Sequence, residues 1–143
     1  MRWTDTLEIH APGDVVWALN TDVEQWPTRT PTMQSVQRLD RGPFQVGSQA
    51  RIKQPGQPLA VWTVTRLRPG HEFSWQTVRR GLVLIGTHRV DAAGDGSRNT
   101  LQIDATGPLS RPFGLLFGAA VRRALRTENA GFKTAAEQQT STA

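Results

Sequence analysis

Hydrophobic and polar residues alternate at the start of the chain and again through most of its middle. Trp3, Asp5, Leu7 and Ile9 share one face of segment 3–10, a pattern typical of a strand with one buried face. Six further strand-like segments follow, at residues 34–39, 48–54, 60–66, 73–78, 82–90 and 101–105. Short breaks rich in Gly and Pro separate them, so the pattern predicts a meandering antiparallel sheet of seven strands.

Two short helices are expected between the first two strands. Pro12 suits a first helical turn, and we expect the helix that it begins to break at Asn20. A second short helix, capped by Thr21 or Asp22, is expected to end at Pro27, because proline cannot continue the hydrogen-bond pattern of a helix.

A long helix is predicted at the end of the chain. Apolar residues recur at i, i+3 and i+4 between Phe113 and Phe132, which is the spacing of one helical face. We expect this helix to begin at Ser110 or Arg111 and to end at Gln138, followed by a polar tail at 139–143. Strand, two short helices, six strands and one long helix indicate an α+β domain over residues 1–138.

Composition narrows the class of protein. The 143 residues fit one domain, and the absence of cysteine excludes a disulfide scaffold, a thiolate zinc site and a cysteine nucleophile. No apolar run approaches the ~20 residues of a membrane helix, and no signal peptide is recognisable, so we expect a cytoplasmic protein without integral membrane association. The three histidines have no metal-ligand spacing, so no metal is expected. We also expect no cofactor.

The positive charge does not indicate a nucleic-acid partner. The net charge is +5, from 17 basic and 12 acidic residues. The arginines are dispersed along the chain, and no recognition motif for nucleic acid accompanies them. We therefore expect no nucleic-acid partner.

Several local sequences, in this order, resemble one superfamily over nearly the entire chain. They are Ile9–Pro12 with Val16–Trp17, Trp26–Pro27, Trp62–Thr65, Arg68–Trp75, Gly86–Val90, the turn at 94–100, and the long helix with Glu128. Together they resemble the START/birch-pollen-allergen-like (SRPBCC) superfamily, in the branch of polyketide cyclases, dehydrases and lipid-transport proteins. The resemblance implies the helix-grip fold, in which a curved seven-stranded sheet wraps around the C-terminal helix and encloses a cavity.

Strand parity and the helical stripe predict which residues line this cavity. They are Gln54, Trp62, Trp75, Thr77, His88, Phe113 and Phe117. Trp62 and Trp75 are expected on adjacent strands, either as walls for a flat apolar ligand or as core residues. Gln54 and Thr77 are expected either to orient a ligand or to form hydrogen bonds at a strand end.

Glu128 stands out in the helical pattern. At ~100° per residue from Phe113, it falls at about 60°, inside an apolar stripe that runs from Ala120 to Leu125. An unpaired charge there is costly, so Glu128 is expected to be protonated or to have a partner. One interpretation places it in the cavity, protonated or paired with His88. The other makes it a structural acceptor of hydrogen bonds from backbone N–H groups, an indole N–H or an arginine, where the long helix meets the two short ones.

Two functions fit this resemblance. The first is a carrier or sensor that binds a small hydrophobic molecule, which is aromatic, polyketide-like or lipid-like. The second is a polyketide cyclase, aromatase or dehydratase that uses the same cavity, with His88 and Glu128 as the catalytic residues. The sequence indicates neither the identity of the ligand nor an oligomeric state.

Overall fold

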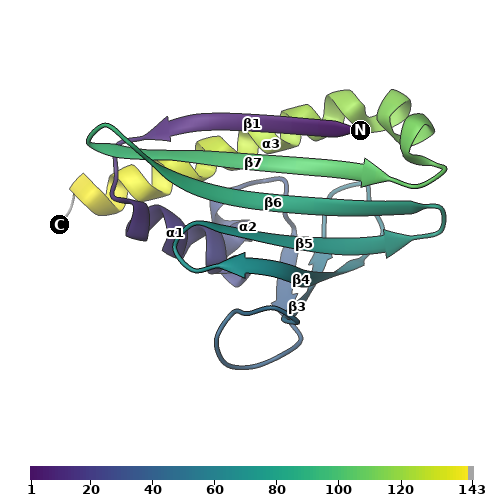
Figure 1. Cartoon of the computed structure of the whole chain (residues 1–143), viewed down its shortest axis with the longest axis horizontal. Coiled ribbons are helices and arrows are strands. Elements are labelled where there is room, and N and C mark those ends of the chain that lie inside the picture. Colours follow the sequence, from purple (N-terminus) through teal and green to yellow (C-terminus); the bar gives the residue numbers. More distant parts are fainter. Residues whose placement is uncertain (142–143) are drawn as a thin grey trace.

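Seven antiparallel strands form a single curved sheet in the computed structural model, which describes residues 1–141 (Figure 1). Their order across the sheet is β1-β7-β6-β5-β4-β3-β2, so the first and last strands pair and every other neighbour is a hairpin. The strands are β1 (Arg2–Ile9), β2 (Ser35–Arg38), β3 (Gln49–Lys53), β4 (Ala60–Arg68), β5 (Glu72–Arg79), β6 (Leu82–Ala93) and β7 (Gly96–Thr106). The predicted helix-grip architecture is confirmed.

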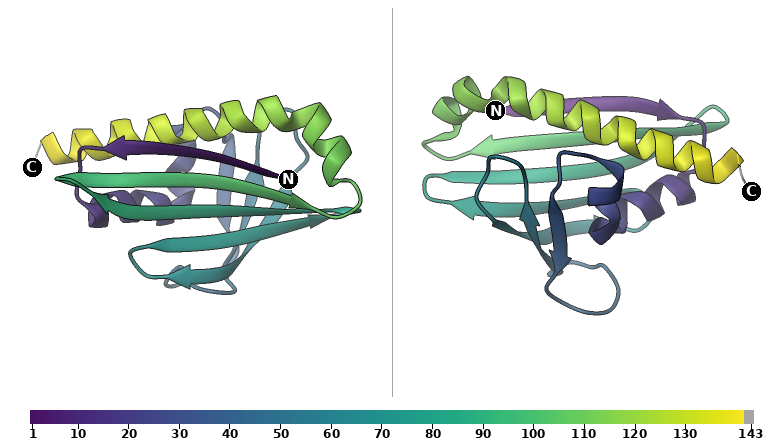
Figure 2. Two further views of the ribbon diagram at one scale, coloured as in Figure 1. Left: turned by 45° about the horizontal axis from the view of Figure 1, so that its top comes forward. Right: turned by 180° about the vertical axis from the view of Figure 1, so that it is seen from behind.

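The helices lie on one side of this sheet. Between β1 and β2 the chain forms α1 (Gly13–Thr21), the 3-10 turn η1 (Val23–Gln25) and α2 (Trp26–Arg29). The long helix α3 (Ser110–Ser141) runs along β1 and β7, with α1 and α2 against its later turns (Figure 2). Figure 2 also shows the first turns of α3 bending relative to the rest of the helix.

Alternation along the strands places one side chain in two against the helices. On β5, Phe73, Trp75 and Thr77 are buried, and on β6 the residues Leu82, Leu84, His88 and Val90 are buried. The side chains expected on the inner face of these two strands therefore lie there. A register shift between Val64 and Arg66 disturbs the pairing of β4 with β5, beyond the point where Trp62 faces inward.

The short helices differ from the prediction in three respects. α1 continues through Asn20 to Thr21, because the buried Asn20 amide finds partners inside the fold. Pro27 lies in the first turn of α2, where its missing N–H costs no helical hydrogen bond, and does not end a helix. Asp22 precedes η1, but no side-chain hydrogen bond caps either short element.

The end of α3 also differs from the sequence-based boundary. The helix begins at Ser110, as expected, and continues to Ser141, three residues into the segment assigned to a polar tail. The last two residues of that segment, 142 and 143, lie outside the described residues. The β6–β7 hairpin is likewise longer than expected, since β7 begins at Gly96 directly after the turn.

Candidate functional site

A cavity of about 130 Å³ lies between the sheet and α3. Most of its lining is apolar, and the strands and the helix supply it from opposite sides. The sheet contributes Ile52, Trp62, Trp75, Leu84, Gly86, His88, Leu101 and Ile103, whereas α3 contributes Phe113, Phe117, Ala120, Val121, Ala124, Leu125 and Glu128. Such a lining, apolar with a few placed polar groups, is typical of small-molecule sites.

Six of the seven residues predicted to line the cavity do so. They are Gln54, Trp62, Trp75, His88, Phe113 and Phe117. Thr77 is buried on the same face of β5 but is not part of the lining. The roles of these residues in binding stay predictions.

Phe117 is more exposed than the helical stripe suggests. Its side chain lines the cavity, yet it is 49% exposed, and Leu115 beside it is 86% exposed. Of the buried residues of α3, Gly118 alone precedes Leu125. The first half of α3 therefore buries fewer side chains than the second half, and it covers one side of the cavity.

The aromatic wall of the cavity is built around Trp75. The rings of Trp62 and Trp75 have centroids 5.8 Å apart, and the ring of Trp26 from α2 meets Trp75 edge-on at 5.3 Å. Gly86 on β6 leaves the space for this arrangement, because a Cβ atom there would lie 3.3 Å from the Trp75 indole. The indole of Trp75 thus lies across its neighbouring strand as a flat surface in the cavity.

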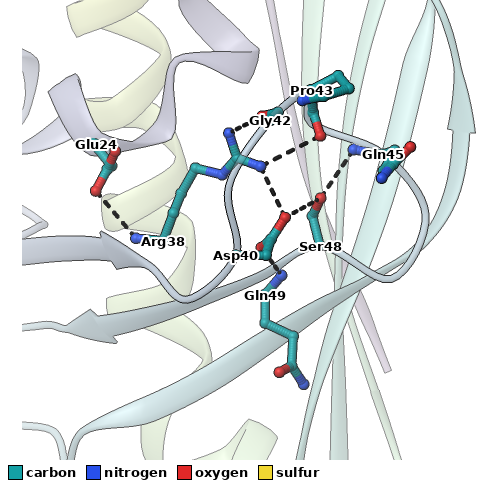
Figure 3. A network of polar contacts seen from close by, with 8 residues as sticks. All are labelled: Glu24, Arg38, Asp40, Gly42, Pro43, Gln45, Ser48 and Gln49. Atoms are coloured by element: carbon teal, nitrogen blue, oxygen red, sulfur yellow. Dashed lines mark hydrogen bonds and ion pairs between the residues drawn. The ribbon is translucent and has the colours of Figure 1, made fainter.

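A network of polar contacts orders the loop between β2 and β3 (Figure 3). Asp40 accepts hydrogen bonds from the Arg38 guanidinium at 2.9 Å, the Ser48 hydroxyl at 3.0 Å and the backbone N–H of Gln49 at 2.8 Å. The backbone N–H of Gln49, followed by the Ser48 and Arg38 contacts, lowers the pKa of the Asp40 carboxyl. The loop is therefore tied to the strands on both sides of it.

This loop supports the aromatic wall from behind. Phe44 lies within it, and its ring meets Phe73 at 5.0 Å and Trp75 at 6.1 Å, edge-on in both cases. The Arg38 guanidinium lies 5.7 Å from the centre of the Phe44 ring. The loop network and the wall of the cavity are thus one packed unit.

His88 is buried between two aromatic rings. Its imidazole stacks on Phe73 at 4.6 Å and on Trp26 at 5.0 Å, with interplanar angles of 8° and 18°. Burial lowers the pKa of His88 to about 3, so the ring is neutral at neutral pH. Its Nδ1 atom lies 2.8 Å from Oδ1 of Asn20 in α1, and the residue lines the cavity.

Glu128 reaches the same cavity from α3. The Thr32 hydroxyl, in the loop after α2, donates to its Oε1 atom at 2.9 Å, and the Thr30 hydroxyl lies 3.0 Å from that of Thr32. Burial raises the pKa of Glu128 to about 7, against the smaller lowering effect of the Thr32 bond. The side chain can therefore hold or release a proton near neutral pH.

The pairing of Glu128 with His88, one of the alternatives for this carboxyl, does not form among the described residues. No hydrogen bond or ion pair joins the two side chains within residues 1–141. Nδ1 of His88 lies against Oδ1 of Asn20, and Oε1 of Glu128 accepts from the Thr32 hydroxyl. The partner of Glu128 does lie near the short helices, as the structural interpretation predicts, but it is a hydroxyl and not a backbone N–H, an indole or an arginine.

The sequence pattern did not predict several residues that line the cavity. Arg79 and Gln57 line the cavity, where the Arg79 guanidinium donates to the Gln57 side chain at 3.4 Å. Trp26 and Met33 line it too. Arg79 has the same strand parity as Trp75, which was an available signal. The loop residues Gln57 and Met33 had no such signal.

Among residues 1–141, no three His, Cys, Asp or Glu side chains gather as a metal site requires. No helix in that part of the chain is long and apolar enough to span a membrane.

Comparison with known proteins points to one family and one fold. Residues 2–137 match the family described as polyketide cyclase/dehydrase and lipid transport. The comparison with curated protein sequences finds no match.

Solved structures share the fold over nearly the whole chain. The Zhui aromatase/cyclase from Streptomyces sp. R1128 is 18% identical, with a TM-score of 0.78 over 98% of this chain and 95% of its own. A START superfamily protein from Mycobacterium smegmatis is 16% identical, with a TM-score of 0.77 over 96% and 98%. The ginseng major latex-like protein 151 from Panax ginseng is 18% identical, with a TM-score of 0.67 over 95% and 97%. The fold is thus shared by an aromatase/cyclase and by proteins whose names state no reaction.

Proposed function

The chain belongs to the polyketide cyclase/dehydrase and lipid transport family, and we propose on that basis that its cavity binds a small hydrophobic, aromatic molecule for which the protein is a carrier or sensor. The observation that carries the proposal is the cavity between the sheet and α3, with the two indoles of Trp62 and Trp75 in its wall. Indole surfaces supply a large apolar contact area at a low entropic cost.

The size of the cavity narrows the ligand. A dry apolar cavity of ~150 Å³ accepts benzene, so about 130 Å³ fits a single aromatic ring. A larger polyketide-like or lipid-like ligand requires more room. The first half of α3, which carries Phe113 and Phe117 and buries fewer side chains than the second half, is the part of the wall that would move outward to provide it.

Tryptophan fluorescence tests the proposal directly. Single-ring aromatic compounds are expected to quench the emission of the protein on titration, and Trp75→Phe is expected to weaken both the quenching and the affinity. Trp17→Phe is the matched control, because Trp17 contacts Phe73 and does not line the cavity. Quenching that survives in Trp75→Phe but disappears in Trp17→Phe would place the ligand elsewhere, and the absence of binding across a broad hydrophobic library would overturn the proposal.

A second candidate function is a dehydration or cyclisation of a polyketide-type substrate in the same cavity. Glu128 favours it, because a carboxyl with a pKa of about 7 is suited to transfer protons near neutral pH. The aromatase/cyclase of similar fold is a further reason to test it. We expect the native protein, but not Glu128→Gln, to remove water from a β-hydroxy ketone. Mass spectrometry measures the loss of water from the substrate. Binding without turnover in both proteins would leave the carrier or sensor as the function.

A further inference from the structure

A continuous chain of buried side-chain amides connects the cavity to β1. It runs from His88 through Asn20 of α1, Asn99 of β7 and Asn129 of α3 to Asp5, and the three asparagines are fully buried. The distances along it are 2.8, 2.9, 2.8 and 2.9 Å. Each asparagine has one donor end and one acceptor end, so such a chain has a direction.

The Asp5 end sets that direction. The Asn129 amide nitrogen lies 2.9 Å from the Asp5 carboxylate, 3.2 Å from the Asp5 carbonyl and 3.1 Å from the Asn99 carbonyl. Carboxylate and carbonyl oxygens only accept hydrogen bonds, so this end of the Asn129 amide must be the NH₂ group. Its oxygen therefore accepts from the Asn99 side chain, which leaves the oxygen of Asn99 to accept from Asn20.

Two acceptors fix the orientation of the Asn20 amide. Its NH₂ group donates to the Asn99 oxygen and also to the Val16 backbone carbonyl, both at 2.9 Å, and both of its hydrogens are thereby used. The atom that faces Nδ1 of His88 is then the Asn20 oxygen, which needs a donor. Nδ1 of His88 must carry the hydrogen.

A neutral imidazole with its hydrogen on Nδ1 has a bare Nε2. Burial keeps the ring neutral by lowering its pKa to about 3. Nε2 forms no hydrogen bond with any residue in the described part of the chain. The atom is also not fully buried, so a ligand can reach it. Since His88 lines the cavity, this nitrogen offers the cavity an acceptor and no donor.

We propose that Nε2 of His88 accepts a hydrogen bond from the hydroxyl group of a phenol-type ligand, so that the cavity selects aromatic rings that carry a hydroxyl. The inference rests on the proposed binding function and adds a chemical class to it. The volume of the cavity admits one ring, and the bare nitrogen requires a donor on that ring. Asn20, Asn99 and Asn129 are positioning residues, because they act on the ligand only through the tautomer of His88.

Phenol and toluene are the probes for this inference, since they have the same number of heavy atoms and only phenol has a donor. Both affinities are measured by calorimetry for the native protein, for His88→Phe and for the control His71→Phe, whose side chain is exposed. We expect His88→Phe to lower the affinity for phenol relative to that for toluene about tenfold or more, because a buried hydroxyl then loses its acceptor. The control is expected to leave this ratio unchanged.

Nitrogen NMR of the native protein tests the same inference without a substitution. The Nδ1 and Nε2 resonances of His88 are expected in the protonated and bare ranges respectively, and phenol, but not toluene, is expected to shift the Nε2 resonance. A protonated Nε2, or a phenol-to-toluene ratio that His88→Phe leaves unchanged, would overturn the inference and leave the proposed binding function standing. If neither probe binds the native protein, the binding proposal fails and this inference fails with it.

Discussion

Replacing Glu128 with glutamine is expected to raise the stability of the protein above neutral pH. Burial raises the pKa of this carboxyl from 4.5 to about 7 in the folded protein. Between these values the folded protein binds more protons than the unfolded chain, so the free energy of unfolding falls as the pH rises from 4.5 to about 7. Glutamine has no proton to lose and does not share this fall.

The pKa values set the size of the effect. The difference between 4.5 and about 7 corresponds to about 3 kcal/mol at ~1.36 kcal/mol per pKa unit. Glu128 is partly exposed, so solvent screening makes this value an upper limit. At pH 8 we expect Glu128→Gln to be more stable than the native protein by up to about 3 kcal/mol, or roughly 6–12 °C in Tm. At pH 4.5 the two should be nearly equal, because both side chains then are neutral and both can accept from Thr32.

Thermal and urea unfolding at pH 4.5 and pH 8, followed by circular dichroism, measure the difference. Glu137→Gln is the matched control on the same helix. A hydrogen bond from Lys133 at 2.6 Å and one from the backbone N–H of His10 lower the pKa of Glu137. Its stabilising contribution is present above the ordinary pKa and is lost as the pH falls through the lowered one. The control should therefore be less stable than the native protein at both pH 8 and pH 4.5, and should approach it only in more acidic solution.

The opposite result for Glu128→Gln would refute this reasoning. A Tm several degrees below that of the native protein at pH 8 would mean that the ionised carboxylate, through Thr32, stabilises the fold more than its burial costs. Unchanged affinity for aromatic ligands in the same variant would then identify Glu128 as a structural residue. Lost binding or turnover in a stable variant would assign the carboxyl to the ligand.

Three further substitutions test the packing around the site. Asn99→Leu breaks the amide chain and leaves its buried partners unpaired, so the free energy of unfolding in urea should fall by about 2–4 kcal/mol. A fall of less than ~1 kcal/mol would mean that the amide chain contributes little to stability. Gly131→Ala should lower Tm, because its Cβ would clash with a backbone carbonyl of α2, whereas Gly13→Ala, with 3.8 Å of clearance, should not. Equal Tm values for the two variants would contradict the close approach of α3 to α2. Asp40→Asn should lower the free energy of unfolding by about 1–2 kcal/mol at pH 7, and by less as the pH falls through the lowered pKa of Asp40. An effect that does not depend on pH would contradict the role of the Asp40 charge.

The parts of the site that the sequence predicts are those governed by a local period. Alternation on β5 and β6 places Trp75 and His88 inside, because neighbouring side chains on a strand point to opposite faces. Helical periodicity places Glu128 in the cavity for the same kind of reason. The period of α3 assigns Phe117 to the buried face too, yet half of its surface is exposed, because burial also depends on what lies under that turn of the helix.

The polar partners could not be predicted in this way. Asn20 and Asn99 are 79 residues apart and Asn99 and Asn129 are 30 apart, and each is a single polar residue in an otherwise ordinary pattern. On its own, Asn20 indicates a helix break, since asparagine competes for backbone hydrogen bonds. Only the packing of α1, β7 and α3 against one another turns three isolated asparagines into one chain.

The pairing of β1 with β7 determines when the cavity can form during folding. Glu8 and Arg98 are 90 residues apart and Arg2 and Asp104 are 102 apart, whereas the strands from β2 to β7 pair through hairpins. Closing so long a loop costs more entropy than closing a hairpin, so the hairpins can form first and β1 docks late. Until β1 docks, α3 lacks one of the two strands along which it packs, so we expect the helical wall of the cavity to be completed late. If the cavity binds a ligand as proposed, a ligand present during folding is expected to enter before this wall is complete.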